Sequence, residues 1–281
     1  MLQIRTNARA MRRMSRELYA PNTRYAVVSS LEDHQSMSVE HLKQFHTSNY
    51  TPNDSFIFIA GKPTEEVYRT IEKTLDQSSW PKSSLAQKLP EVIYNSNPTM
   101  RAHEDVPNAQ QASLIMGNRT LSIYDPDYYA LQLTVHILGG GYLGSRLMSN
   151  IREEKGLTYS IGAFCMDNPI CNELLITSDV NKDKVEETIT EIKNEVVKLQ
   201  QELVSREEFD LALSILKNQA MQMLDGTIAT GDLLTYLYRL KMDEKYQQNL
   251  FDYFETATPE DVLQCAQKYL DPEQFITVDA H

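Results

Sequence analysis

The chain has 281 residues, of which 41% are hydrophobic and 23% charged, as is typical of a folded globular protein with one large or two ordinary domains. Its 27 basic and 39 acidic residues give a net charge of −12, which argues against nucleic acid as the main partner, because phosphate binding depends on clustered Lys and Arg. A basic peptide would suit this negative field, although the same charge also serves simply to keep a protein soluble.

The cysteines and the first residues exclude further classes. Cys165, Cys171 and Cys265 are an odd number with no CxxC spacing, so neither a disulfide framework nor a zinc knuckle is indicated. Residues 1–19 are rich in arginine and lack a continuous apolar core, so a secretory signal is not expected. A cytoplasmic location is favoured on these grounds, and no apolar run is long enough to span a bilayer.

The first third of the chain predicts helices, one strand and a linker. A helix is expected through about residue 20, and Ser38 is placed to cap a second one. Residues 56–61 predict a buried strand, and Thr64 precedes a further helix with acidic residues in its first turn. Residues 77–98 then carry repeated Ser, Pro and Asn, which indicates a domain junction.

The remainder predicts strands and longer helices. Strands are expected over residues 109–117, 157–164 and 172–180, and a helix from Asp125 to about Leu138. Apolar positions at helical spacing predict an amphipathic helix after Lys182, carried by Val185, Ile189, Ile192, Val196, Leu199 and Leu203. Ser205 and Glu208 have the spacing of a capping box for the next helix. This order predicts an α+β fold, an antiparallel sheet covered by helices.

A repeated pattern suggests two related domains. Residues 38–61 and 258–280 each contain a capped helix, a tyrosine near its end, a proline turn and a segment beginning Phe-Ile. The second copy follows a full domain's worth of chain, whereas only 37 residues precede the first. Residues 1–84 are therefore expected to be the C-terminal part of a first, truncated domain, and residues 85–281 a complete second domain.

The rest of the chain is organised around residues 138–164. Three consecutive glycines, Gly139, Gly140 and Gly141, leave the backbone free to turn sharply or to approach another group closely. A helix is predicted from Ser145 to Lys155, and Gly156 stands where a helix end favours positive φ. Arg152 would then lie in the last helical turn and Tyr159 at the start of the next strand, so the two side chains could converge.

This stretch resembles the second half of the insulinase, pitrilysin and mitochondrial processing peptidase family of inverted-motif zinc metallopeptidases. In that family a glycine-rich turn is followed by an IRExxGLxYS segment whose Arg and Tyr bind substrate. The matching positions are Leu138, Gly139, Gly140, Gly141, Ser145, Arg146, Leu147, Ile151, Arg152, Glu153, Gly156, Leu157, Tyr159 and Ser160. The resemblance implies that Arg152 and Tyr159 hydrogen-bond a peptide substrate, and that the three glycines let its backbone approach.

Metal ligands with the family's spacing are missing. No HxxEH or HExxH occurs, His41 and His46 are five apart, and His103, His136 and His281 stand isolated. We therefore expect no catalytic residue and no metal ligand in this chain, with His136 a satisfied core residue. The resemblance implies that the zinc lies on an upstream segment or on a homologous partner chain in a homo- or heterodimer, so that the chain is inactive alone.

Two alternatives remain. The chain could be a catalytically silent scaffold, like the family's structural relatives in respiratory complexes; retention of Arg152 and Tyr159 favours a peptide-binding half of a peptidase. Gly139, Gly141 and Gly144 also satisfy the GxGxxG pattern of dinucleotide-binding proteins. That pattern needs a preceding strand, however, and the Asp-Pro start at residue 125 predicts a helix there.

Overall fold

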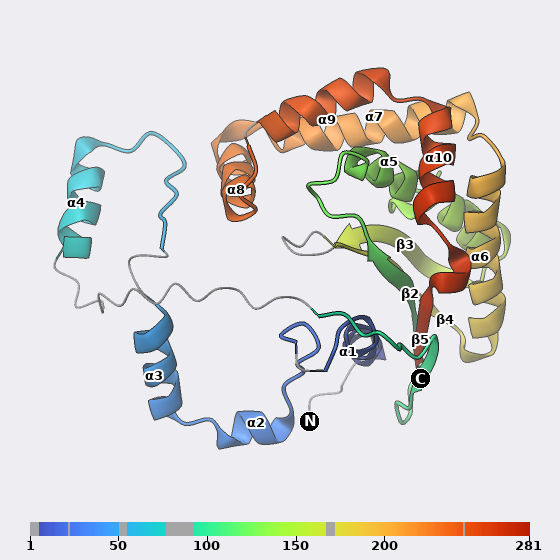
Figure 1. The fold of residues 1–281 in the computed structure, drawn as a ribbon, viewed down its shortest axis with the longest axis horizontal. Coiled ribbons are helices and arrows are strands. Elements are labelled where there is room, and N and C mark those ends of the chain that lie inside the picture. Colours follow the sequence, from blue (N-terminus) through green and yellow to red (C-terminus); the bar gives the residue numbers. More distant parts are fainter. Residues whose placement is uncertain (1–5, 22, 51–54, 77–92, 167–171, 244) are drawn as a thin grey trace. The chain divides into compact units, whose positions relative to one another are not determined.

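A computed structural model gives the fold of the chain, shown in Figure 1. It describes residues 6–21, 23–50, 55–76, 93–166, 172–243 and 245–281. Its described elements are helices and one mixed sheet, so the predicted α+β class is confirmed. Among these residues, no helix is both long and apolar enough to cross a membrane.

The chain divides into two compact units. One, here called the sheet unit, comprises residues 1–27, 92–219 and 245–281. The other, here called the helical unit, comprises residues 28–91 and 220–244. The predicted domain junction between residues 84 and 85 falls outside the described residues, so that boundary stays a prediction.

The sheet unit is built on a five-stranded sheet. In spatial order its strands are β1 (Arg101–Glu104), β5 (Ile276–Ala280), β2 (Ala112–Thr120), β4 (Asn172–Val180) and β3 (Thr158–Met166). β1 runs parallel to β5, and the other neighbouring strands are antiparallel. The predicted antiparallel arrangement therefore holds for every described pair except this one, and the short β1 is the strand that the sequence did not predict.

Helices cover the sheet, and this explains its apolar strands. All five residues of β5 are buried, as are the first six of β2. On one side α1 (Thr6–Leu18) packs on β2 and β5. On the other side α5 (Tyr128–Gly139) packs on β3, and α10 (Pro259–Tyr269) packs on α5 and on α6 (Val185–Gln201) (Figure 1). A sheet covered on both faces needs strands that are apolar throughout, rather than alternating.

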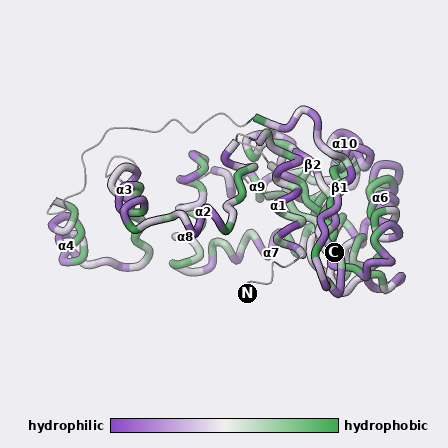
Figure 2. Tube along the Cα trace, turned by 90° about the horizontal axis from the view of Figure 1, so that it is seen from below, coloured by the Kyte–Doolittle hydropathy of each residue, from purple (hydrophilic) through white to green (hydrophobic). Residues whose placement is uncertain are grey.

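The remaining elements of this unit are helical. They are a π-helix over Met148–Glu154, 3₁₀ helices over Lys182–Lys184 and Pro272–Gln274, α9 (Lys245–Thr256), and α7 (Arg206–Gln222) up to residue 219. The predicted amphipathic helix is confirmed as α6, along which hydrophobic and hydrophilic positions alternate (Figure 2). Its predicted apolar face is buried as far as Leu199, but Leu203 lies beyond the end of the helix and is exposed.

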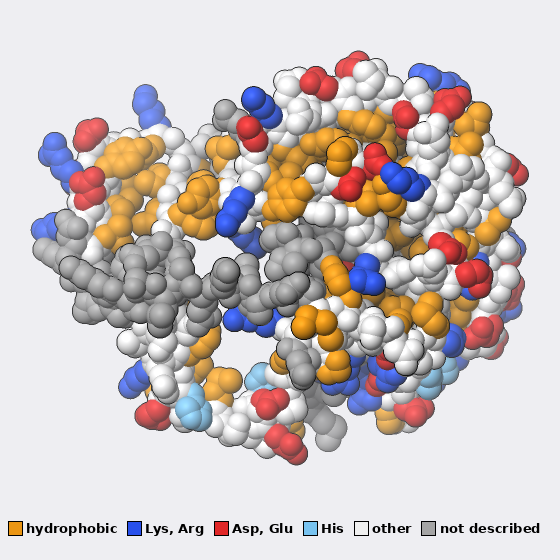
Figure 3. All heavy atoms as spheres, viewed as in Figure 1, with side chains coloured by type: hydrophobic (Ala, Val, Ile, Leu, Met, Phe, Trp, Pro, Cys, Tyr) orange, Lys and Arg blue, Asp and Glu red, His pale blue; other side chains and the backbone are white. Residues whose placement is uncertain are grey.

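The helical unit contains four described helices. They are α2 (Leu31–Ser36), α3 (Val39–Asn49), α4 (Glu65–Asp76) and α8 (Gly226–Arg239). The predicted buried strand over residues 56–61 is wrong: this segment is not a strand, and Phe56, Ile57, Phe58 and Ile59 are all exposed. A strand needs a neighbouring strand to pair with, and the described sheet contains no strand that pairs with residues 56–61. Exposed hydrophobic side chains of this kind are visible at the surface in Figure 3.

Candidate functional site

The glycine-rich turn follows α5 directly. The N–H of Gly140 donates to the carbonyl of His136 at 2.8 Å, which completes the last turn of the helix. Gly141 then has a φ of +80°, a conformation that side chains with a Cβ rarely adopt. The helix before this turn removes the dinucleotide alternative, because a GxGxxG fingerprint requires a strand in that position.

Two of the three glycines are required by internal packing. A Cβ on Gly139 would lie 2.7 Å from the backbone nitrogen of Ala163 in β3, and one on Gly140 would lie 2.1 Å from Nδ1 of His136. A Cβ on Gly141 would meet nothing within 4 Å. At Gly139 and Gly140 the turn therefore packs closely against its own domain. At Gly141 there is open space, so this is the glycine that a substrate backbone could approach.

The segment after the turn differs from the predicted α-helix. Residues 148–154 form a π-helix, and the N–H of Lys155 donates to the carbonyl of Asn150, five residues back, at 3.0 Å. Ile151 is buried, and the Asn150 side chain donates to Glu195 of α6 at 2.6 Å. Gly156, at φ +62°, ends the segment as the sequence predicted. Short π-helical segments are frequent at functional sites.

Arg152 and Tyr159 meet, as the sequence predicted. The pairing of β3 with β4 is irregular between Thr158 and Ser160, so Tyr159 is the extra residue of a bulge. Tyr159 is 81% exposed, and the Arg152 guanidinium lies over its ring at 4.9 Å from the centroid. Nε of Arg152 is 3.2 Å from a carboxylate oxygen of Glu153. The pair thus presents a cation and a phenol on the surface, at the start of a strand that is the last in the described sheet.

Arg146 fixes the turn to α7. Its guanidinium donates to both carboxylate oxygens of Glu208, at 2.7 and 3.1 Å. Ser205 accepts the N–H of Glu208 at 3.1 Å, which is one half of the predicted capping box, but the Glu208 carboxylate is committed to Arg146. A bidentate, half-buried pair of this kind sets orientation as well as adding stability.

His136 lies buried beneath the turn. Its ring stacks on Tyr142 with the centroids 4.9 Å apart. Burial lowers the pKa of His136 to about 4, and burial is also the main reason that the pKa of Tyr142 rises to about 12. His136 is a buried core residue as predicted, but its Nε2 has no hydrogen-bond partner in the described structure, so it is not the fully satisfied histidine that was expected. The stack on Tyr142 packs against the face of the His136 ring but supplies no hydrogen bond to Nε2 at its edge.

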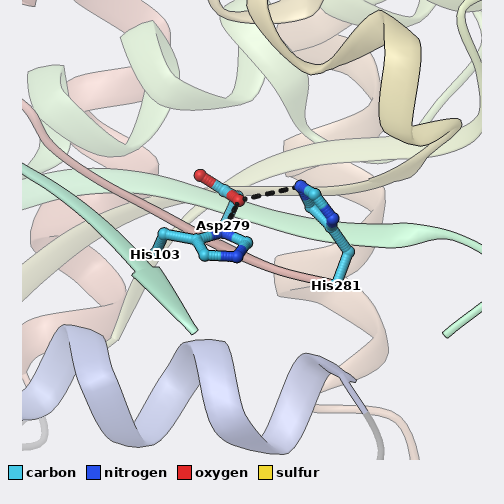
Figure 4. A group of neighbouring side chains, drawn as sticks. All are labelled: His103, Asp279 and His281. Carbon is cyan, nitrogen blue, oxygen red and sulfur yellow. Dashed lines mark hydrogen bonds and ion pairs between the residues drawn. The ribbon is translucent and has the colours of Figure 1, made fainter. Parts of the chain in front are cut away.

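Two histidines that look isolated in the sequence lie together. His103 of β1 and His281 flank Asp279 of β5, as Figure 4 shows. The reason is register, since His103 is paired directly with Asp279 and His281 follows two residues later. The Asp-Ala-His ending was the available signal, because residues two apart on a strand share a face.

A family model described as the peptidase M16 inactive domain matches residues 36–216. The chain belongs to this peptidase M16 family. The Bacillus subtilis protein named "uncharacterized zinc protease YmxG" is 23% identical over 203 residues, covering 72% of this chain and 48% of that protein. The "probable inactive metalloprotease YmfF" of the same organism is 22% identical over 260 residues, covering 89% and 58%. The chain thus spans about half the length of the curated M16 relatives it matches.

Solved structures share the fold. A peptidase M16 inactive domain from Pseudomonas fluorescens superimposes with a TM-score of 0.83 at 22% identity, covering 98% of this chain and 65% of that one. A chain of complex III2 from Candida albicans gives a TM-score of 0.77 at 10% identity, covering 99% and 67%. The names of the relatives imply a zinc ion. This sequence has no HxxEH, so it lacks the motif that would supply the family's zinc ligands.

Proposed function

We propose that this M16 domain binds peptides and orients them for hydrolysis at a zinc site carried by an upstream segment or a partner chain. The observation that carries the proposal is the pair of a half-buried Arg152 and an exposed Tyr159, stacked at a β-bulge. Bulges of this kind re-aim side chains and are frequent beside active sites. No step of hydrolysis is assigned to this chain itself.

The chemistry of the pair suits a peptide backbone. A guanidinium donates several hydrogen bonds in a fixed plane and a phenol donates one, and both can reach peptide carbonyl oxygens. The cation above the ring keeps the two donors close together without joining them by a hydrogen bond. Gly141, with open space at its Cβ position, leaves the turn accessible to a substrate's main chain. These groups would position a peptide rather than cleave it.

The experiment compares peptide binding by three variants of the full chain. The probe is a fluorescein-labelled, unstructured basic peptide of about ten residues, followed by fluorescence polarisation. Arg152→Ala and Tyr159→Phe should each weaken binding at least tenfold, because loss of a charge-assisted hydrogen bond costs about 1.5–3 kcal/mol. Both should leave the melting temperature almost unchanged, since a helix-end arginine contributes only about 0.3–1 kcal/mol.

Arg206→Ala is the matched control. Arg206 also lies over an aromatic ring, that of Phe209, at 5.7 Å, but it belongs to α7, where its Nε is 2.9 Å from Asp210. It should bind the peptide as the wild type does. Equal loss in all three variants would mean that the effect is general electrostatics, and unchanged binding in Arg152→Ala and Tyr159→Phe would refute the role of the pair.

A second candidate is a catalytically silent scaffold. The fold shared with a chain of complex III2 and the relative named an inactive metalloprotease favour it. A scaffold predicts no saturable peptide binding by the wild-type chain, either alone or when a zinc-bearing M16 partner is added. Saturable binding that depends on Arg152 would exclude it.

A further inference from the structure

The cluster of His103, Asp279 and His281 lies away from the Arg152 pair and has no part in the proposed function. Backbone pairing fixes each of its members. His103 is in register with Asp279 between the parallel strands β1 and β5. His281 is held by two further bonds, because its N–H donates to Glu104 at 3.1 Å and its carbonyl accepts from Val106 at 3.0 Å.

Three potential ligand atoms converge on one point. Nδ1 of His103 lies 2.5 Å from Oδ2 of Asp279, and Nε2 of His281 lies 3.3 Å from the same oxygen. The three side chains offer ligand atoms that all lie within 4.8 Å of one another. Figure 4 shows both rings directed at the carboxylate, one from each side.

The surroundings of the cluster support metal ligation. Asp279 is buried, and Arg101 binds its Oδ1, which orients the carboxylate and leaves Oδ2 for another partner. Nε2 of His103 lies 3.4 Å from Asp105, so the ring nitrogen that faces away from the cluster has a carboxylate beside it. Metal-bound histidines nearly always have such an outer partner, which fixes the tautomer and the ring's orientation.

The local charge does not oppose a cation. Arg101 is the nearest positive group, and it is shared between Asp279 and Glu186, the latter at 2.7 Å. Glu104, the last residue of β1, and Asp105 after it add negative charge, and Glu104 lies 3.4 Å from Arg13 of α1. Arg9 is directed at the carbonyl of Asp105. Carboxylates therefore outnumber guanidinium groups around the two imidazoles.

We propose that His103, Asp279 and His281 bind a divalent transition-metal ion of the Zn²⁺ type, through Nδ1, Oδ2 and Nε2 respectively. Two imidazoles and one carboxylate suit Zn²⁺ and its neighbours, whereas Mg²⁺ and Ca²⁺ prefer oxygen ligands. At metal–ligand distances of about 2.0–2.2 Å, tetrahedral ligands lie about 3.2–3.6 Å apart. Nε2 of His281 and Oδ2 of Asp279 are already separated by that distance. A small rotation of the half-exposed His103 ring would bring its Nδ1 from 2.5 Å to the same separation from Oδ2.

Such an ion would join β1 to β5 and to His281, the residue that follows β5. It would replace the proton in the hydrogen bond between His103 and Asp279, and leave a fourth position for water. No general base or hydrolytic role is assigned to it. The inference revises the sequence-based expectation of a chain without metal ligands, and it stands whether or not the peptide-binding proposal is correct.

The test is titration of the full chain with ZnCl₂ after dialysis against a chelator, followed by calorimetry at about pH 7.5. One Zn²⁺ per chain should bind, and His103→Gln and His281→Gln should each weaken binding at least tenfold. Glutamine keeps hydrogen-bonding capacity beside Asp279, and the His281 ring is only partly buried, so at least this second variant should fold. His46→Gln, which removes an exposed imidazole of α3, is the matched control and should bind as the wild type does.

Two further readouts separate a built site from surface binding. Zn²⁺ should raise the melting temperature of the wild type and of His46→Gln, but not that of His281→Gln. Co²⁺ should give the visible absorption of a four-coordinate site in the same two proteins only. Absence of stoichiometric binding, or binding that survives loss of either His103 or His281, would overturn the proposal.

Discussion

The two copies of the internal repeat share a local pattern and differ in burial. α3 and α10 are each 11 residues long, and each begins with a complete capping box, Ser38 with His41 and Thr258 with Asp261. α10 buries Val262, Cys265 and Ala266, whereas α3 buries none of its residues. The segments that follow differ in the same way, since β5 is buried throughout and residues 55–60 are exposed.

The difference teaches what a local pattern can and cannot determine. A cap and a helical period act within about one turn, so both copies form the same helix. Burial depends on partners from elsewhere in the chain: β5 lies between β1 and β2, and α10 packs on α5 and α6. The first copy has no described strand beside residues 55–60. We take this as support for the proposal that its domain continues upstream, as the greater length of the relatives also suggests.

The largest expected effect comes from the residues that end the two helices. Leu270 is 1% exposed and Tyr50 is 55% exposed, and each occupies the C-cap of its helix. Leu270→Ala should lower the free energy of unfolding by about 2–5 kcal/mol, through lost burial and the cavity left behind. Tyr50→Ala should change it by less than about 0.5 kcal/mol. Urea unfolding followed by circular dichroism measures both, and similar values would show that the copies do not differ in packing.

Burial also separates a histidine under the glycine turn from those of α3. His136 is 7% exposed in α5, and burial lowers its pKa to about 4, whereas His46 is exposed. Between the unfolded pKa of about 6.5 and this value, the unfolded chain binds more protons, so stability falls as the pH falls. The loss should approach about 1.4 kcal/mol per pH unit, or about 1–2 kcal/mol between pH 7 and 5.

His136→Phe should remove this contribution while keeping the stack on Tyr142. His46→Gln, which removes an exposed ring of α3 instead, is measured beside it as the control. The measurement is urea unfolding at several pH values, taken as the difference between each variant and the wild type. A parallel pH profile for wild type and His136→Phe would show that His136 takes up its proton without opposing the fold.

Much of the fold could be predicted because its signals are local. The apolar period of α6, the cap of α10 and the positive φ of Gly156 each depend on a few neighbouring residues. The strand over residues 56–61 was wrong for the opposite reason, since an apolar run states only that burial is favourable, not that a partner is present. β1 was missed because four residues of mixed polarity carry almost no period.

The candidate sites divide along the same line. Arg152 and Tyr159 flank a single turn, so their meeting follows from the elements on either side of Gly156. The π-helix that contains Arg152 could not be predicted from its neighbours alone, and its Asn150 bonds to Glu195, 45 residues away in α6. His103 and His281 are 178 positions apart and meet only through the parallel pairing of β1 with β5. Spacing rules that search for ligands on one helix do not detect such a group.

The smallest predicted effect tests whether equal caps contribute equally to stability. In each copy the side-chain hydroxyl accepts the N–H three residues on, at 3.1 Å for Ser38 and 3.3 Å for Thr258. Thr258→Ala should lower the free energy of global unfolding by about 1 kcal/mol, because α10 is part of a buried core and its fraying exposes apolar surface. Ser38→Ala should increase amide hydrogen exchange at His41 to the same degree, but change global unfolding by less than about 0.5 kcal/mol. If Ser38→Ala instead lowers the free energy of unfolding in urea as much as Thr258→Ala does, α3 unfolds together with a buried core. The two copies would then differ in how much surface they bury and not in how strongly they are coupled to the rest of the fold.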